Sequence, residues 1–481
     1  MLNSPVAFTK PIGLFADGPP PNAITATQRN TTPISAVLTR ASICYCAGTA
    51  NLKQEESVRK PLKRITFVMR AGSGAVIILA VLALSWTTRY GIADWLSTSA
   101  TEGAVLRATT LAPQNTSAWL RLADLRSTND EDAIGPLRQA LASSPEDSHI
   151  WIQLGLELEG RREYAEAERC LTRAVELDRD FIPIWTLTNY YLRRDDTVRF
   201  FPAVRRTLAY SRGDLSPLFR MCWSITDDGA RILRDAIPDR DDVLSAYLQW
   251  LGSQLLGTQL DVAGPVAKRL LDRFPEQGTP ALLGYCDRLI SAQRLDAAMA
   301  LWNQMSDRGS IRTGPVQQDR IVDGNFRSPP LNTAFGWRTG SPAGVDIAAG
   351  GSSLNLSFSG TQPDHCDVVT QLTLLHSDRT YRLRYRFESS GLEAGAGLHW
   401  IVADARSGAR FAPPLSQFRI TPSDFAMAHA NEGDFTFIVP PASAPQLPVL
   451  ARVALVYDRD PASAHMQGWI RVDKVWLEEA K

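Results

Sequence analysis

Aromatic and polar side chains in the last third of the chain could form a surface that binds a ligand. A tryptophan ring can stack on an apolar ring face such as that of a sugar, and a few polar side chains can fix the ligand by hydrogen bonds. The alternative for each tryptophan is a place in a hydrophobic core. The candidates of these types are Trp337, Arg338, Trp400, Asp404, Gln417, Trp469 and Asp473, with Trp476 beside them.

No motif for catalysis accompanies these residues. The chain has no G-x-S-x-G nucleophile turn, no G-x-x-x-x-G-K-[ST] phosphate loop and no H-E-x-x-H zinc pair. The one dense group of possible metal ligands, around His365, lacks a second group at metal spacing. We therefore expect no enzymatic activity, no metal and no cofactor. A carbohydrate-active hydrolase stays as an alternative, because two carboxylates that face one cleft leave no sequence motif.

The composition fits several globular domains and disfavours nucleic acid as a partner. The chain has 481 residues, of which 44% are hydrophobic, so it can bury real cores. It carries 51 basic and 51 acidic residues, whereas a nucleic-acid-binding domain usually has a basic excess. Its 6 cysteines are too few and too scattered for a disulfide framework, and we expect free or buried thiols.

One segment is apolar enough to cross a membrane. Residues 71–88 carry no charge and their centre is aliphatic, and as a helix they would span about 27 Å, close to the hydrocarbon thickness of a bilayer. Trp86 and Tyr90 suit a membrane–water interface. We predict a transmembrane helix over residues 68–90. A buried core helix is the alternative, and it explains the missing polar face poorly.

Basic residues set the expected direction of this span. Those that follow it, Arg89 and Arg107, are balanced by Asp94 and Glu102. The positive-inside rule then places the N-terminus in the cytoplasm and the rest outside, as in a single-pass protein of the bacterial inner membrane with periplasmic or other extracytoplasmic domains. The basic residues that precede the span are Lys53, Arg59, Lys60, Lys63, Arg64 and Arg70.

The residues before the span leave two interpretations open. Residues 1–63 are rich in Pro, Thr, Ala and Ser without periodicity, which predicts a disordered cytoplasmic tail. A cleaved signal peptide would begin nearer the N-terminus and be followed by a clear cleavage site. Met69 offers a second start, from which the apolar segment would be a compact signal anchor. The tail would then be an artefact of the assumed start.

Tryptophans recur at a regular spacing after the span. Trp119 follows Pro113, and Trp151 follows Pro145, at the same interval, and Trp185 comes one repeat later. This spacing resembles the tetratricopeptide repeat (TPR), a helix hairpin of about 34 residues. Apolar periodicity continues beyond residue 210, where the signature decays. The resemblance implies an α-solenoid over residues 98–308, with degenerate repeats in its second half.

The family pattern is clearest in residues 151–178. Trp151, Leu154 and Gly155 match its first helix, and small residues such as Ala167 and Ala174 suit its second. Because one hairpin cannot bury its own apolar face, at least three must stack. Members of the family bind peptides or proteins on their concave surface, so the resemblance implies a protein partner. The candidate groove residues are Gln153 and Asn189, for which ordinary solvated surface is the alternative.

Helical periodicity stops after residue 308. Residues 309–318 have the composition of a linker, and residues 319–481 contain short segments that alternate apolar and polar side chains between turns. The clearest places Tyr381, Leu383 and Phe387 on one face and arginines on the other. Such one-sided strands predict an antiparallel β-sandwich.

Five short motifs in this domain resemble jelly-roll carbohydrate-binding modules and galactose-binding-like domains. The family usually has a Glu where this chain has Arg327, which puts a structural calcium in doubt. The resemblance implies that residues 319–481 bind a glycan. The motif residues, in order, are Gly324, Asn325 and Phe326; Gly336 and Trp337; Gly351, Ser353 and Leu354; Tyr381 and Leu383; and Asp473, Val475 and Leu477.

The expected fold is multidomain, with one transmembrane helix, an all-α TPR-like solenoid and an all-β antiparallel jelly-roll sandwich. This order of parts resembles membrane-anchored proteins of bacterial exopolysaccharide or cell-surface polysaccharide assembly. The expected function is that of an extracytoplasmic scaffold that recruits a protein and binds a polysaccharide. The alternative is a purely structural protein-interaction module that binds no sugar.

Overall fold

The computed structural model describes residues 59–253, 258–390, 397–411, 431–441, 448–459, 461 and 463–480, without the side chains of residues 59–77, 258–260 and 431. Most of the predicted tail, residues 1–58, lies outside this description, as does the candidate Gln417. Residues 59–63, which we assigned to the tail, instead begin helix α1 (Arg59–Ser97). Leu and Lys at these positions have high helix propensity, so the helix extends upstream of the apolar segment.

Helix α1 contains the segment that we predicted to span a membrane. Compact packing divides the chain into residues 1–82 and residues 83–481. Among the residues that the structure describes, no helix is both long enough and apolar enough to cross a membrane. The side chains of residues 71–77, the first part of the predicted span, are not described. The transmembrane helix at 68–90 therefore stays a prediction.

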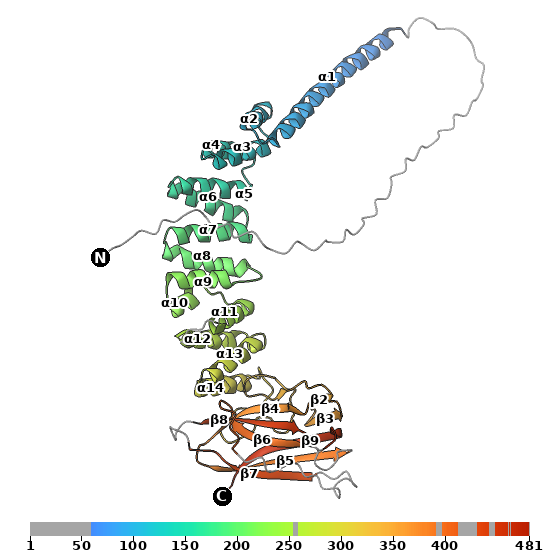
Figure 1. The fold of residues 1–481 in the computed structure, drawn as a ribbon. Coiled ribbons are helices and arrows are strands. Elements are labelled where there is room, and N and C mark those ends of the chain that lie inside the picture. The colour runs from blue at the N-terminus through green and yellow to red at the C-terminus, as the bar shows by residue number, and fades with distance from the viewer. Residues whose placement is uncertain are drawn as a thin grey trace, which may run out of the picture. The chain divides into compact units, whose positions relative to one another are not determined.

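Helices that pack side by side fill the middle of the chain (Figure 1). Each is amphipathic or short, and its apolar side packs against its neighbours. The helices are α2 (Glu102–Leu111), α3 (Thr116–Thr128), α4 (Ile134–Ser143), α5 (Ser148–Gly160), α6 (Tyr164–Leu177), α7 (Phe181–Arg193), α8 (Thr197–Tyr210), α9 (Ser216–Ile225), α10 (Gly229–Asp235), α11 (Asp241–Ser253), α12 (Thr258–Arg273), α13 (Thr279–Ser291) and α14 (Leu295–Asp307).

Hydrogen bonds explain why proline and tryptophan recur at a fixed interval. The Trp119 indole Nε1 donates to the carbonyl of Pro113 at 2.7 Å. The Trp151 Nε1 donates to the carbonyl of Pro145 at 2.9 Å. In both cases the tryptophan in the first helix of a pair fixes the turn that enters this helix. The spacing therefore marks equivalent positions of two repeats.

Gly155 lets the two helices of the clearest repeat approach each other. A Cβ at this position would lie 2.7 Å from the Leu171 side chain of α6 and 3.3 Å from the Ala167 carbonyl. Such distances are shorter than carbon contacts in folded proteins, so only glycine allows this approach. The small residue predicted for close helix packing has this role.

The second half of the helical region keeps the paired arrangement but varies in length. Helix α10 has only 7 residues, beside 14 in α8 and 16 in α12. Pro202 lies inside α8, where it cannot donate a helical hydrogen bond. Helix pairing therefore persists in the part of the chain where the repeat signature decays.

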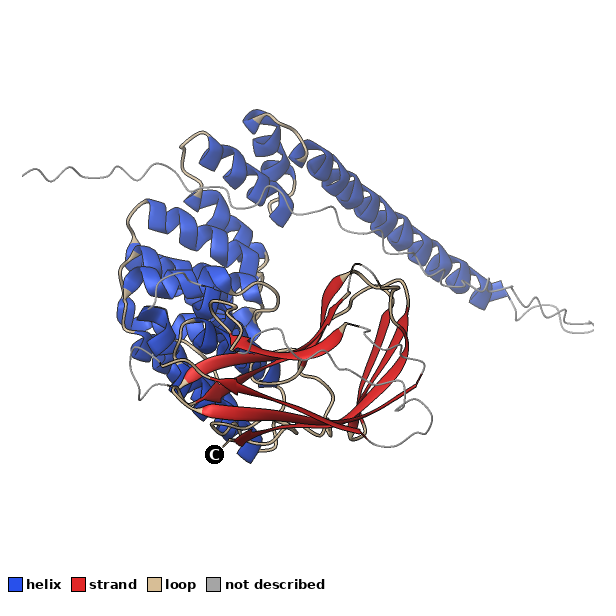
Figure 2. Cartoon of the chain, turned by 60° about the horizontal axis from the view of Figure 1, so that its bottom comes forward, coloured by secondary structure: helices blue, strands red, loops and turns tan. Residues whose placement is uncertain are grey.

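The remainder of the chain is a sandwich of two antiparallel sheets, whose strands face each other in Figure 2. One sheet has the order β1-β4-β8-β6 and the other the order β2-β3-β9-β5-β7. The predicted order of helices followed by antiparallel strands is confirmed. The strands are β1 (Arg338–Thr339), β2 (Val345–Gly350), β3 (Ser353–Ser359), β4 (His365–Leu375), β5 (Thr380–Ser390), β6 (Leu398–Asp404), β7 (Asn431–Ile438), β8 (Val449–Asp458) and β9 (Gln467–Glu479).

Strand β5 has the alternation that its sequence predicts. Tyr381 and Leu383 are fully buried between the sheets, while Arg382 and Arg386 are exposed on the outer face. Opposite β5, strand β9 contains a bulge: Arg386 pairs with Lys474, but Phe387 pairs with Val472, so Asp473 is the extra residue. The bulge reverses the parity of β9, and both Trp469 and Trp476 therefore face outward.

The sandwich shares a hydrophobic core with the last helices. One cluster of buried apolar residues runs from Ala123 in α3 to Phe335 and Leu374 of the sandwich. Trp302 of α14 packs edge-on against Phe335, with ring centroids 5.8 Å apart. The two domains are therefore joined by packing as well as by the chain.

The segment that we expected to be a linker, residues 309–318, takes part in this packing. Ile311 and Val316 are 4% and 3% exposed. The Asn303 side chain holds Val316 by two hydrogen bonds, from its Nδ2 to the Val316 carbonyl at 3.1 Å and from the Val316 N–H to its Oδ1 at 2.7 Å. The mostly polar composition of the segment predicted a linker, but its apolar residues Ile311 and Val316 are buried and anchor it to the helices.

Candidate functional site

Two of the predicted ligand-binding tryptophans lie in the sandwich core. Trp337 and Trp400 are 3% and 4% exposed, and their ring centroids are 6.2 Å apart. The Trp337 Nε1 donates to the Asp323 carbonyl at 3.0 Å, which fixes the loop at the start of the domain. Neither ring has a face open to solvent, so in this structure neither can stack on a sugar.

Arg338 joins the sandwich to the helices. Its Nη2 lies 2.8 Å from Oδ1 of Asp287 in α13. The same carboxylate accepts a hydrogen bond from the Ala334 N–H at 2.9 Å and another from the Thr333 hydroxyl. Arg338 is therefore part of the domain interface, and ligand binding by it stays a prediction.

The other polar candidates have local structural partners. Asp404 ends β6 and accepts hydrogen bonds from the N–H and hydroxyl of Ser407, at 2.6 and 2.8 Å. Burial raises the pKa of Asp404, but these hydrogen bonds outweigh it and hold the pKa below its usual value. Asp473, at the bulge, accepts from the Arg471 Nε at 2.9 Å. Gln417 lies outside the described residues.

Trp469 is the candidate that lies on an open surface. Its side chain is 42% exposed and borders a hollow of about 370 Å³ on the outer face of β2, β3 and β9. The polar side chains in the lining are Asp346, Asn355 and Ser357. Ser357 pairs directly with Trp469 across the strands. An aromatic ring beside short polar side chains can hold a small polar ring, with one face stacked and its edge hydrogen-bonded.

Trp476 lies on the same outer face but in a charged setting. The cationic groups of Lys474 and Arg384 lie 4.8 and 5.1 Å from its ring centre. Its Nε1 donates to Glu478 at 2.7 Å. The Trp476 hydrogen bond and the neighbouring arginines lower the pKa of Glu478. These cation–π contacts occupy the ring, so Trp476 offers a poorer stacking surface than Trp469.

The two predicted groove residues differ in what they offer a partner. Gln153 of α5 is half-buried. Asn189 of α7 is also half-buried, and its Nδ2 donates to the Trp185 carbonyl of its own helix at 2.9 Å. The structure does not bring the two together in one described hollow.

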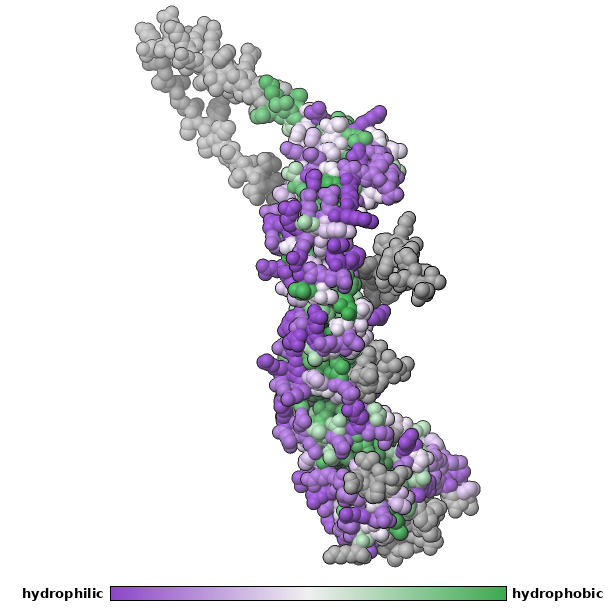
Figure 3. Space-filling view, turned by 90° about the vertical axis from the view of Figure 1, so that its left-hand side faces the viewer, coloured by the Kyte–Doolittle hydropathy of each residue, from purple (hydrophilic) through white to green (hydrophobic). Residues whose placement is uncertain are grey.

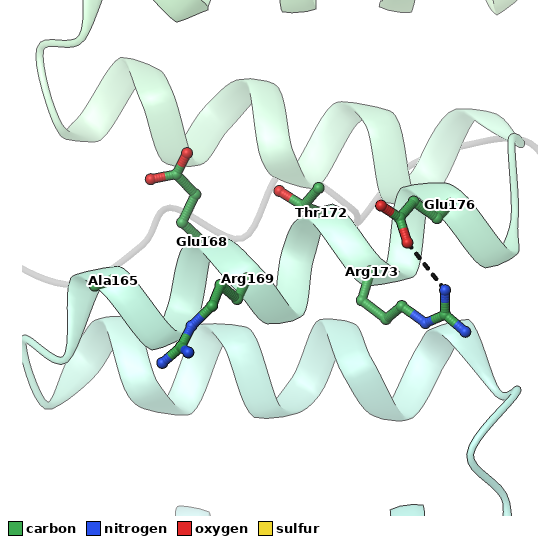
Figure 4. A pocket seen from close by; sticks show the side chains of 6 residues that line it. All are labelled: Ala165, Glu168, Arg169, Thr172, Arg173 and Glu176. Atoms are coloured by element: carbon green, nitrogen blue, oxygen red, sulfur yellow. Dashed lines mark hydrogen bonds and ion pairs between the residues drawn. The ribbon is translucent and has the colours of Figure 1, made fainter.

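Hollows lie beside several of the described helices. One lies beside α6, and its described lining comes from that helix alone, with Arg173 paired to Glu176 at 2.9 Å (Figure 4). A small one of about 130 Å³ lies between α11 and α13. The third, of about 480 Å³, lies between α8 and α10 and has both apolar and basic lining. The sequence analysis did not predict this third hollow, because the repeat pattern does not indicate that α10 is short.

Histidines and carboxylates meet at one end of the sandwich without forming a described metal site. His365 contacts the carboxylate of Asp458, and the His399 Nε2 lies 3.3 Å from the same carboxylate. Within the described part of the chain, no group of three or more His, Cys, Asp or Glu side chains could hold a metal ion.

The loop at Asp323 explains the motif that resembled the start of a carbohydrate-binding module. Asp323 accepts hydrogen bonds from the N–H groups of Arg327 and Ser328 at 3.0 and 2.9 Å. A Cβ at Gly324 would lie 2.0 Å from the Val475 carbonyl. The motif therefore fastens the start of the domain to β9 and is structural.

Among the comparisons with known proteins, only the comparison with solved structures found similar proteins. No family model matches the chain, and no curated protein matches it either. A crystal structure of YrrB, described as a TPR protein with an unusual peptide-binding site, is 12% identical, covers 43% of this chain and 93% of its own, and has a TM-score of 0.22. Yeast Tom70 is 14% identical over 46% of this chain and 51% of its own, with a TM-score of 0.25.

A likeness to a structure described as CBM4 falls at the same level. It is 12% identical, covers 33% of this chain and 99% of its own, and has a TM-score of 0.23. Scores this low carry no conclusion about function.

Proposed function

We propose that this protein is a membrane-anchored scaffold outside the cytoplasm, which recruits a protein through its repeats and holds a glycan on its sandwich. The observation that carries the proposal is the common core of α14 and the sandwich, where Trp302 packs against Phe335. A fixed sandwich at the end of a helical solenoid presents two binding surfaces in one constant arrangement. This is the property that a scaffold needs.

Exposed apolar side chains support the membrane anchor. Ile78, Leu82 and Leu84 of α1 are 59–65% exposed, and no polar face interrupts residues 78–84. Figure 3 shows hydrophobic side chains gathered on the described part of α1. A helix that is apolar all round suits a lipid surrounding better than water. Together with the basic residues before it, this supports an inner-membrane protein with its C-terminal domains outside the cytoplasm.

The hollow at Trp469 supports glycan binding. It combines one half-exposed indole with short hydroxyl, amide and carboxylate groups, as sugar recognition requires. The proposed ligand is a polysaccharide of the cell surface or an exopolysaccharide in assembly. The proposed role is non-enzymatic, since the described lining contains one carboxylate, Asp346, whereas glycoside hydrolysis generally needs two.

A second function has an observation in its favour. In this alternative the sandwich only caps the last helices, and sugars are irrelevant. Arg338 and the core position of Trp337 and Trp400 favour it, because residues that resembled a sugar site are used for packing. The two functions differ at Trp469, which the cap does not need.

Glycan-array binding with the full chain separates these functions. We expect a Trp469→Ala variant to lose at least tenfold in affinity for any bound polysaccharide, which corresponds to about 1.4 kcal/mol, with little change in thermal stability. Phe181→Ala, which removes an aromatic ring of similar exposure from α7, is the matched control. If the unaltered protein binds no polysaccharide, or if Trp469→Ala binds as well as it does, the glycan half of the proposal is wrong.

A reporter fused at about residue 95 tests the anchor. We expect activity from a reporter that works only outside the cytoplasm, and recovery of the full chain in the membrane fraction. Activity from a cytoplasmic reporter at this position would overturn both the orientation and the proposed location.

A further inference from the structure

The hollow between α8 and α10 lies where the second helices of two repeats meet. Helix α10 has 7 residues and α8 has 14, so α10 covers only part of the α8 flank. The resulting hollow of about 480 Å³ is open to solvent along this seam. The shortened helix α10 therefore leaves a recess at this seam.

The α8 wall of this recess carries two apolar side chains. Val198 is 78% exposed, and Pro202 is exposed beside it on α8. Pro202 has no N–H, so the Val198 carbonyl lacks its usual helical donor. This wall can thus receive an apolar side chain together with an N–H group of an extended peptide.

The rim of the recess is basic. The Arg205 Nη1 donates to the Arg234 carbonyl at 2.9 Å, which holds its guanidinium across the seam. In the described lining the carboxylate is that of Asp235, which lies 2.9 Å from Arg234 and 3.8 Å from Arg231. The described lining therefore has three guanidinium groups and one carboxylate, an excess of positive charge that attracts an anionic ligand.

We propose that this recess binds an acidic segment of a partner protein. An apolar side chain of the segment lies on Val198 and Pro202, and its carboxylates contact Arg205 and Arg234. The inference rests on the proposed recruitment of a protein by the repeats and assigns that recruitment to the second-helix layer.

Nucleic acid is the less suitable anion. Single-stranded nucleic acid binds by stacking its bases on open aromatic faces. The aromatic ring in the lining is Phe201, which is 1% exposed and has the Arg231 guanidinium 4.8 Å from its centre. A recess with an aliphatic wall and a basic rim fits an acidic peptide better than it fits a nucleic acid.

A fluorescent peptide with a Leu-Phe pair flanked by acidic residues tests the proposal with the full chain. We expect saturable binding that weakens as salt concentration rises, and no binding of a peptide with lysine in place of each acidic residue. Val198→Asp and Arg234→Glu should each weaken binding by about tenfold or more. Both side chains are exposed, so the fold should tolerate the substitutions. The matched control is Arg173→Glu on α6, where Arg173 is also half-exposed and paired to a carboxylate.

Several outcomes would overturn this inference. One is no saturable binding of the acidic peptide up to about 1 mM. Another is equal binding by the Val198→Asp, Arg234→Glu and Arg173→Glu variants. A third is tighter binding of a labelled thymidine oligonucleotide that is lost in the same variants. If peptide binding instead depends on Gln153 of α5, the recess is not the site, while recruitment of a protein by the repeats still stands.

Discussion

At the scale of single residues, Asp287 is a polar side chain that joins the helices to the sandwich. Its carboxylate forms an ion pair with Arg338 and accepts hydrogen bonds from the Ala334 N–H and the Thr333 hydroxyl, all of which belong to the sandwich. It lies next to the buried Cys286 in α13. One side chain of the helices therefore positions the first loop of the sandwich.

Replacing Asp287 should loosen this interface. We expect Asp287→Ala to lower the free energy of unfolding by about 1–3 kcal/mol, because three donors lose their acceptor. Urea denaturation followed by circular dichroism measures this. Asp261→Ala is the control, since Asp261 is 65% exposed and among the described residues forms an ion pair with Arg294, and it should change stability by less than about 1 kcal/mol. Equal effects of the two substitutions would contradict the role of Asp287.

Buried thiol and phenol groups predict a loss of stability in alkali. Burial, with a smaller effect from Glu166, raises the pKa of Cys170 from 9.0 to about 11. Burial and then Glu168 raise the pKa of Tyr191 from 10.0 to about 12. In the unfolded chain these groups lose their protons at lower pH than in the folded chain, so stability must fall as pH rises from about 9 to 12.

Urea midpoints at pH 7.5, 9 and 10.5 would check this sign. The midpoint should be constant up to about pH 8.5 and then decrease, and the decrease should be smaller in Cys170→Ala. A midpoint that rises with pH above 9 would show that other groups control the alkaline behaviour.

Residue chemistry was only partly predictable from the sequence. Trp469 was a candidate and lies on an open surface, but Trp337 and Trp400 have the same residue type and are buried. The distinction depends on which face of a strand each occupies, and on whether another element covers that face. Nothing in the sequence around Arg338 indicates that it forms an ion pair with an aspartate of α13.

At the scale of elements, substitutions at Gly155 and Gly160 distinguish the effect of close helix packing from that of helix propensity. We expect Gly155→Ala to destabilise the protein by about 1–3 kcal/mol, because the new Cβ would overlap the Leu171 side chain. At Gly160, the end of the same helix, an added Cβ would meet nothing within 4 Å. Gly160→Ala should therefore be neutral or stabilising by up to about 1 kcal/mol. Thermal unfolding of the two variants makes the comparison. A gain of stability in Gly155→Ala as well as in Gly160→Ala would show that helix propensity outweighs the overlap with Leu171.

Helices and strands were predictable where their periodicity is simple. The alternation of β5 and the rhythm of α5 and α6 identify these elements directly. The bulge in β9 was present in the sequence but unrecognised: the buried residues Ile470 and Val472 are followed by Val475 and Leu477, so the apolar parity changes between Val472 and Val475. The shortened α10 could not be predicted, because helix length depends on packing against α8 and α12.

At the scale of the whole molecule, the common core predicts joint unfolding of helices and sandwich. Trp302 and Phe335 are both fully buried and in edge-to-face contact. We expect residues 83–481, as part of the full chain, to unfold in one calorimetric transition. Phe335→Ala should remove about 3–5 kcal/mol and separate the transition into two.

Phe181→Ala serves as the control for this experiment, because Phe181 of α7 is 40% exposed and far along the chain from the interface. It should leave one transition. Two resolved transitions in the unaltered protein would mean that the shared core is too weak to couple the domains. The sequence could predict two domains from the change in periodicity, but it could not predict their coupling, since the anchors Ile311 and Val316 lie in a segment of linker-like composition.

The fixed position of the sandwich has a consequence for how two ligands would be held together. With a flexible linker, the effective concentration of one bound ligand near the other depends on linker length. Here Asn303 and Asp287 hold residues 316 and 333–338 against α13 and α14. The effective concentration is then set by the fixed distance between the two surfaces. Two linked ligands whose spacing matches this distance gain avidity. Linked ligands of any other spacing bind as if each surface were alone.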